Sequence, residues 1–359
     1  MEITVKGQTE LCREVRDAQL CTACGACVDL CPYHAIHQDQ VVTLHACDIK
    51  SGRCYAFCPR TPADTESMRT RFFDPGDLTP EVGAVKDYLI ARAASEAARR
   101  AAQHGGTVTA LMSLALKEGL IQSAVVSENA DAFVQRGVAV TKSQEIRKRG
   151  GSRFISAGAV AAFNRAAQST VERIGVVATP CQAFALAKMR MKPIPEKDNH
   201  IDKLKLVIGL FCGWTLSWRT FTALLESRVG LKNVTGMDIF PGKKQVDILT
   251  AKGSVGIPWE EIDPLVRDAC RYCMDTTAEY ADLSVGSARI PLPWEELRTW
   301  NQVIVRTQRG RDLIELARKK KVLEFREAPA AALEELKRAA LAKKEASLAK
   351  PAEKTGNRA

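Results

Sequence analysis

The chain has 359 residues, of which 46% are hydrophobic and 26% charged, values ordinary for a folded protein of one or two domains. It contains no run of eighteen apolar residues and no apolar leader, so we expect no transmembrane helix and a cytoplasmic protein. The formal net charge is +10, but aromatic residues make up only 6% and do not interleave with a basic stripe, which argues against nucleic-acid binding.

Cysteine is unevenly distributed along the chain. Eight of the twelve cysteines lie before residue 60, and the other four are spread from residue 181 to residue 273. In a reducing compartment, cysteines grouped at short fixed spacings indicate metal ligation and not disulfide bonds. Residues 1–70 show little apolar periodicity, so we expect this segment to be held together by its metal sites and not by a core of its own.

The first cysteine motif reads C-x2-C-x2-C-x3-C-P over residues 21–32. This run is typical of bacterial two-cluster ferredoxins, in which the fourth cysteine ligates the other [4Fe–4S] cluster. Gly25 within it allows a tight turn around the cluster. Cys54, Cys58 and Pro59 repeat the end of the motif. We therefore predict a ferredoxin-like (α+β) segment whose first cluster is bound by Cys21, Cys24, Cys27 and Cys58.

A second cluster is predicted from the remaining thiolates of this segment, which are Cys31, Cys47 and Cys54. Its expected fourth ligand falls at Ser51, which is not a cysteine. Asp48, Cys12 or a cluster of lower nuclearity could fill the gap. A zinc-binding knuckle is the alternative for the whole segment, but zinc sites usually present two C-x2-C pairs and do not need a C-P ending.

Beyond a proline-marked connection, residues 82–328 alternate between short apolar strands and amphipathic helices, which predicts an α/β domain. We expect helices over 108–120 and 312–319. We expect strands over 124–127, 174–178, 204–211, 282–286 and 302–306, with a β-rich patch between 234 and 257. Residues 329–359 are dominated by Ala, Glu, Lys and Leu, and predict a solvated, charged helix that frays into a disordered end.

The four later cysteines are placed near the ends of predicted strands. Cys181 and Cys212 each follow a strand, whereas Cys270 and Cys273 form a C-x2-C pair just ahead of another strand. Because the carboxyl ends of strands form the ligand crevice of an open α/β sheet, four thiols there could hold a third [4Fe–4S] cluster. Taken singly, Cys181 or Cys212 fits a buried, inert core residue better than a ligand, and it is the C-x2-C pair that favours ligation.

Several stretches of this region resemble, in the same order, the β subunit of coenzyme F420-reducing hydrogenase and its relatives, which include formate dehydrogenase β subunits. They are residues 104–111, 151–154, 179–182, 209–212, 270–275 and 281–286. The resemblance implies a mixed-sheet α/β domain in which Cys181, Cys212, Cys270 and Cys273 bind one [4Fe–4S] cluster beside an FAD.

The resemblance also implies where the flavin lies. Two adjacent glycines that open a helix let backbone N–H groups approach a pyrophosphate, although such a pair can also be a plain helix-start turn. Arg153 could pair with the anionic tail of F420 or with the FAD phosphates. The implied cofactor-binding residues are Gly105, Gly106, Thr107, Val108, Thr109, Gly151, Ser152, Arg153, Thr179 and Pro180.

The function that the resemblance implies joins two kinds of electron carrier. F420 moves two electrons as a hydride and each iron–sulfur cluster moves one, and a flavin can couple them. We expect no acid or base side chain to be needed, so no catalytic residue is predicted. The alternative is a wiring subunit that does not use F420 and serves a hydrogenase, formate dehydrogenase or heterodisulfide-reductase-like partner. A nicotinamide enzyme is disfavoured, since no G-x-G-x-x-G follows a strand.

Overall fold

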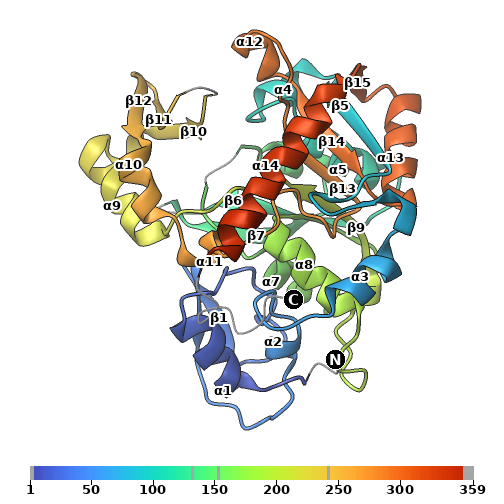
Figure 1. Ribbon diagram of the computed structural model, residues 1–359, viewed down its shortest axis with the longest axis vertical. Helices are drawn as coiled ribbons and strands as arrows, with labels where there is room; N and C mark the ends of the chain where they lie inside the picture. The colour runs from blue at the N-terminus through green and yellow to red at the C-terminus, as the bar shows by residue number, and fades with distance from the viewer. Residues whose placement is uncertain (1–3, 131–132, 152–153, 241–242, 351–359) are drawn as a thin grey trace.

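The computed structural model describes residues 4–130, 133–151, 154–240 and 243–350, and is built around an eight-stranded sheet (Figure 1). Four neighbouring strands in its middle are parallel to one another. The strands beyond them, toward both edges, each pair antiparallel with the neighbouring strand, so the whole is a mixed sheet. The mixed α/β sheet predicted from the sequence is therefore confirmed. In spatial order the strands are β15 (Leu323–Arg326), β5 (Asp87–Ala93), β14 (Asn301–Val305), β13 (Leu283–Ser287), β9 (Leu204–Leu210), β8 (Ile174–Ala178), β6 (Ser123–Asn129) and β7 (Gln135–Val140).

Helices cover both faces of this sheet because its central strands are apolar on both sides. Along β9, Leu206 and Ile208 face one apolar cluster and Val207 faces the other. One cluster includes α7 (Ala159–Ala167) and α8 (Pro180–Arg190), and the other includes α5 (Thr107–Lys117) and α13 (Gln308–Lys319). The shorter helices of this region are α4 (Glu96–Arg100), α6 (Ser143–Arg147), α11 (Asp268–Arg271) and α12 (Trp294–Leu297).

A small antiparallel sheet lies to one side of the main sheet in Figure 1. It comprises β10 (Val234–Asp238), β11 (Gln245–Thr250) and β12 (Gly253–Pro258), which confirms the predicted β-rich patch. Its apolar face packs with α9 (Trp218–Arg228) and α10 (Trp259–Ile262) around a separate core that includes Phe221, Val246 and Ile248.

The cysteine-rich segment packs against the main domain through α7. The segment contains α1 (Gln8–Leu11), a π-helical turn (Cys12–Asp17), the hairpin β1 (His34–His37) and β2 (Gln40–Thr43), α2 (Arg53–Ala56) and α3 (Thr65–Phe72). The expectation that it lacks a core is wrong, because Leu11, Val15, Leu20 and Tyr55 are buried together. The Val160 amide donates to the Cys24 carbonyl at 3.1 Å.

The last described helix, α14 (Ala330–Leu348), crosses the molecule (Figure 1). The helix is as expected, but it is not simply solvated. Leu336 and Ala340 are buried against Ile304 and against Val82, which lies between the short strands β3 (Leu78–Thr79) and β4 (Gly83–Ala84). Among the described helices, none is both long enough and apolar enough to span a bilayer.

Candidate metal and cofactor site

Strand direction brings several segments to one edge of the main sheet. β5, β13, β9, β8 and β6 run the same way, because β14 is antiparallel to both of its neighbours. The segments that follow these strands meet at the carboxyl edge, where α/β sheets bind ligands. Cys212 follows β9, Thr179 and Pro180 follow β8, and the Gly105 carbonyl accepts a 2.7 Å hydrogen bond from Ala93 at the end of β5.

The four later cysteines, which we call the third set, come together at this edge. Burial raises the pKa of the Cys212 thiol, and the charges of Cys270, Cys181 and Cys273 raise it further. Burial likewise raises the pKa of Cys181, to which Cys273 and Cys270 also contribute. Hydrogen bonds agree with this grouping, since the Cys212 amide donates to the Thr276 carbonyl at 2.8 Å, close after Cys273, and Thr215, close after Cys212, donates to Cys270 Sγ.

Local geometry orients the sulfurs of the third set. Thr179 begins α8 and its amide donates to the Gln182 side chain at 2.9 Å, while its hydroxyl lies 3.4 Å from Cys181 Sγ. The Thr215 amide donates to Cys270 Sγ at 3.3 Å. Hydrogen bonds to ligand sulfur of this kind tune the reduction potentials of iron–sulfur clusters.

The predicted ligands of the first cluster, which form the first set, are also brought together. Burial raises the pKa of Cys27, and Cys21, Cys24 and Cys58 add to the rise. Cys24 is buried in the same apolar cluster that Cys181 contacts, and the charge of Cys181 is the largest contribution after burial to its raised pKa. The first and third sets are therefore neighbours.

The second set contains the three predicted cysteines Cys31, Cys47 and Cys54. Burial raises the pKa of Cys54 to about 11, and Cys31, Cys47 and the first-set Cys58 each contribute to the rise. The second set therefore lies beside the first set.

The residues considered for the fourth position of the second set are otherwise engaged or exposed. Ser51 Oγ donates to the Val5 carbonyl at 3.2 Å. Cys12 Sγ accepts from the Arg16 guanidinium at 3.4 Å and lies 3.7 Å from Thr43 Oγ1. Asp48 is exposed. The structure thus assembles three thiols here, and the contacts of Cys12 Sγ are with Arg16 and Thr43.

Single metal ions and iron–sulfur cubes require different spacings between their thiolate ligands. Within the described ranges, no three His, Cys, Asp or Glu side chains are arranged to hold one metal ion. A zinc ion draws each thiolate to about 2.3 Å, which crowds the sulfurs together. A four-iron cube places one thiolate at each corner and so spaces them more widely.

Buried positive charge accompanies the cysteine sets and fits an anionic group there. Lys188 Nζ on α8 donates to the Cys58 carbonyl at 2.7 Å and to the Thr61 hydroxyl at 2.7 Å, all its described acceptors being neutral. Burial lowers the pKa of Lys188 to about 8, against the opposing effect of Cys58 and Cys24. Burial would also lower the pKa of Lys343 on α14, but the thiolates of Cys273 and its neighbours raise it instead.

These cations were not predicted from the sequence. Lys188 is buried and follows an apolar run, residues 183–187, which is a signal that could have drawn attention to it. Arg60 also joins the sets, since its guanidinium donates to the Tyr272 carbonyl at 2.8 Å and to the Ala269 carbonyl. The residue follows Pro59 at the end of the second cysteine motif. Its role could be read only from the folded structure.

The glycine turn predicted to contact the flavin has a packing reason of its own. Gly106 has φ +74°, and a Cβ on Gly105 would lie 2.7 Å from Asn301 Oδ1. The same Asn301 oxygen accepts from the Thr107 amide at 3.3 Å. Thr107 and Thr109 are buried, and Val108 is half-buried. The turn therefore lies at the ligand edge, but Asn301 already engages one of its amides.

Two ring nitrogens beside this turn are buried and lack a partner among the described residues. They are His104 Nδ1 and Trp294 Nε1, on rings whose centroids are 6.5 Å apart. Burial lowers the pKa of His104, so that its imidazole is favoured as the neutral form. Such groups suit a bound molecule with its own hydrogen-bonding atoms. Trp294 was not predicted as a site residue, because it lies far from His104 along the chain.

The other predicted flavin loop approaches the same turn. Gly150 leaves no room for a side chain next to the Ala101 carbonyl, so this loop touches the segment before Gly105. The Arg149 guanidinium donates to Glu128 at 2.9 Å, close to the end of β6. Gly151 is exposed, whereas Ser152 and Arg153 lie outside the described residues.

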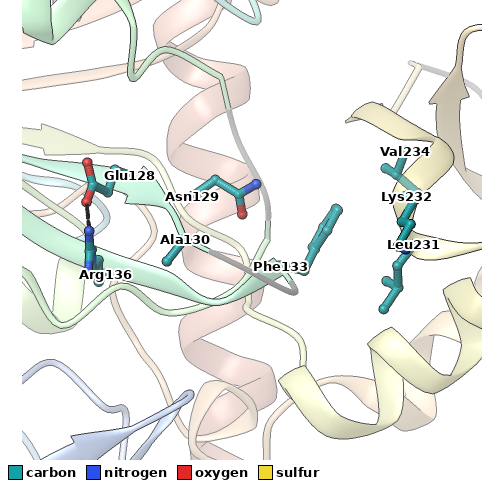
Figure 2. Close-up of a pocket in the computed structure, with 8 residues that line it drawn as sticks. All are labelled: Glu128, Asn129, Ala130, Phe133, Arg136, Leu231, Lys232 and Val234. Carbon is teal, nitrogen blue, oxygen red and sulfur yellow. Dashed lines mark hydrogen bonds and ion pairs between the residues drawn. The ribbon is translucent and has the colours of Figure 1, made fainter.

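A cavity of about 630 Å³ opens beside the end of β6 (Figure 2). Its volume is in the range of small-molecule sites. Figure 2 shows the Phe133 side chain between the two sides of this cavity. The β6–β7 hairpin forms one side, and residues 231–234, at the start of β10, form the other. Among the described residues, none of those predicted to bind a cofactor lines it. The lining residues are Glu128, Asn129, Ala130, Phe133, Arg136, Leu231, Lys232 and Val234.

Comparison with known proteins adds family matches to this geometry. Residues 88–164 and 171–331 match the N-terminal and C-terminal models described as "Coenzyme F420 hydrogenase/dehydrogenase, beta subunit". Residues 14–37 match a 4Fe-4S binding domain.

Individual relatives match most of the chain. The beta subunit of coenzyme F420 hydrogenase from Methanothermobacter thermautotrophicus is 30% identical over 241 residues, which cover 66% of this chain and 82% of the relative. One component of the F(420)H(2) dehydrogenase of Methanosarcina mazei is 26% identical over 329 residues, covering 89% and 88%. A chain of the solved F420-reducing [NiFe] hydrogenase complex from Methanosarcina barkeri shares the fold, with a TM-score of 0.69, 24% identity, and coverage of 75% and 92%.

Proposed function

The chain belongs to the coenzyme F420 hydrogenase/dehydrogenase beta-subunit family and carries a 4Fe-4S binding domain, and from this we propose that it passes electrons between reduced F420 and one-electron acceptors. It is an F420-type oxidoreductase subunit. In the proposed reaction, the electrons pass through one FAD and three [4Fe–4S] clusters. When bound, the flavin would accept a hydride and release electrons singly, which couples F420 to the clusters.

The observation that carries this proposal is the arrangement of the three cysteine sets in series. The third set, at the carboxyl edge of the sheet, neighbours the first through Cys181 and Cys24. The first set neighbours the second through Cys58 and Cys54. We propose that electrons travel in this order, from the flavin side of the sheet toward the outer end of the cysteine-rich segment, or in reverse.

The chain's own residues would hold and insulate the groups. The thiolates would ligate the clusters, and Lys188 and Arg60 would offset part of their negative charge in a buried setting. The Gly105–Thr107 turn, His104 and the Gly151 loop would border the flavin, with Thr179 and Pro180 at the side nearest Cys181. Ser152 and Arg153 remain predictions for the same loop.

A redox partner subunit is part of the proposal. Leu44 and Ile49, which flank Cys47 in the outer loop of the cysteine-rich segment, are 54% and 46% exposed. Large apolar side chains exposed on either side of a cluster ligand suit a protein contact. The partner would be a hydrogenase, a formate dehydrogenase or a heterodisulfide-reductase-like protein.

Turnover by the isolated chain tests this function. The full chain, purified without oxygen and loaded with FAD, should oxidise reduced F420 with a one-electron viologen dye as acceptor. Cys270→Ser should abolish dye reduction, and Cys12→Ser, whose sulfur contacts Arg16 and Thr43, should not. A loaded protein that binds flavin but leaves reduced F420 untouched would favour the alternative, in which the chain wires electrons from another carrier.

A further inference from the structure

The C-terminal helix α14 brings a positive charge to the third cysteine set. Resting on the function proposed above, we propose that Lys343 is a positioning residue that holds the carbonyls of Cys212 and Asp275 and raises the reduction potential of the cluster bound there. No group that contacts a substrate is involved. The lysine would act through its charge, which the backbone carbonyls of Cys212 and Asp275 hold beside the ligands.

Two hydrogen bonds fix the ammonium group. Lys343 Nζ donates to the Cys212 carbonyl at 2.9 Å and to the Asp275 carbonyl at 2.8 Å. The Asp275 carbonyl oxygen also lies 3.3 Å from Cys273 Sγ. One carbonyl oxygen therefore lies between the lysine and a sulfur of the third set, and the other belongs to a residue that supplies a second sulfur.

The helix delivers Lys343 by its periodicity. Leu336, Ala340 and Ser347 are buried at positions that share one helix face with Lys343, three, four or seven residues away. The apolar members pack against Val82 and Ile304. The face that anchors α14 to the domain thus continues directly into the side chain that reaches the cysteines.

The neighbouring residue, Lys344, has different partners from Lys343, so the two positive charges have different roles. Lys344 Nζ pairs with Glu279 Oε1 at 2.6 Å and donates to the Pro80 carbonyl at 2.7 Å. Glu279 also pairs with Arg69 at 3.2 Å. Lys344 therefore neutralises a buried carboxylate, whereas both hydrogen bonds of Lys343 go to neutral oxygens.

Charge explains the direction of the effect. A cluster with four thiolate ligands is anionic, and reduction adds one more negative charge in a site that is poorly solvated. A fixed cation a few ångströms away attracts the reduced form more strongly than the oxidised form. Hydrogen bonds and nearby charge are the means by which proteins shift cluster potentials. Removing the ammonium should make this cluster harder to reduce.

Potentiometric titration of the full chain, followed by electron paramagnetic resonance, tests the inference. In Lys343→Met, the reduced-to-oxidised ratio of one cluster at a fixed solution potential should fall by about tenfold, which is about 59 mV for a one-electron couple. The other clusters should titrate as in the wild type. Lys343→Arg should restore most of the shift, since it keeps the charge and the donors.

A matched control lies on the same helix. Lys337 is six residues earlier, about 9 Å along the axis, and its Nζ pairs with Glu334 at 2.8 Å. Lys337→Met removes the same charge from the protein and should leave every cluster potential unchanged. If the control shifts the same cluster as much as Lys343→Met does, the effect is not local and the inference is overturned.

Other results of these measurements would also support or overturn the inference. Wild-type potentials in Lys343→Met, with full iron content, would overturn the inference while leaving the proposed function intact. If the Met variant loses iron, Lys343→Gln, which keeps donors without charge, is titrated instead: a lowered potential supports the inference and an unchanged one overturns it. Wild-type protein that holds neither iron nor flavin would instead refute the proposed function.

Discussion

Replacing Gly25 by alanine should loosen the contact between the cysteine-rich segment and α7. Gly25 has φ +86°, and a Cβ there would lie 2.7 Å from the Ala161 amide nitrogen and 2.8 Å from Ala161 Cβ. The left-handed backbone costs an alanine about 1–2 kcal/mol. Overpacking against backbone that cannot retreat adds about 1–3 kcal/mol. We expect Gly25→Ala to lower the free energy of unfolding by about 2–5 kcal/mol in total.

Urea unfolding of the full chain, followed by circular dichroism with iron quantified in the same samples, measures this effect. Gly76→Ala is the matched control, because no atom of the described residues lies within 4 Å of a Cβ built there, and its effect should stay within about 0.5 kcal/mol. This docking of the segment on α7 is refuted if Gly25→Ala is as stable as Gly76→Ala and retains all of its iron.

Three further changes test other parts of the structure. Asn164→Ala removes an amide that donates to the Val28 carbonyl at 2.7 Å, and leaves that acceptor buried; urea midpoints should show a loss of about 1–3 kcal/mol, and equal midpoints would contradict the contact. Burial raises the pKa of Glu128, but pairing with Arg136 and Arg149 outweighs it, so the pKa is lowered in the folded protein. The ionised Glu128 carboxylate therefore stabilises the fold above the usual glutamate pKa, and this stabilisation is lost as the pH falls through the lowered pKa of the folded state. Glu128→Gln should reduce stability at pH 7 and converge with the wild type in acid, and parallel pH profiles would refute this. Cys270→Ser should lose about four irons per chain whereas Cys12→Ser loses none, so equal losses would contradict the assignment of the sets.

The cysteine sets could be predicted from the sequence because cluster ligation imposes short local spacings. Cys21, Cys24 and Cys27 lie on one loop, and the return of Cys58 follows from the repeated C-P ending. Cys181 and Cys212 could be placed because both follow apolar strands, β8 and β9, that turn out to be parallel neighbours. The strand predictions were most accurate for such buried strands, whose continuous apolar runs stand out.

Other features depend on long-range packing and left little local signal. The composition of α14 is that of a solvated helix, and only the folded domain shows that Leu336, Ala340 and Lys343 face inward. The sequence did not reveal that Gly105 is required by Asn301, almost two hundred residues later, or that Trp294 lies beside His104. The small core around Leu11 and Tyr55 was missed because its members are far apart in a cysteine-rich segment.

Iron and acid-labile sulfide, counted per chain in protein purified without oxygen and compared with its Mössbauer spectrum, test the central claim most directly. Three thiolate sets that hold cubes predict about twelve irons with a matching amount of sulfide, or slightly fewer if the second set, with its three cysteines, binds a smaller cluster. Protein that instead contains zinc and no labile sulfide, whatever its flavin content, would contradict the account.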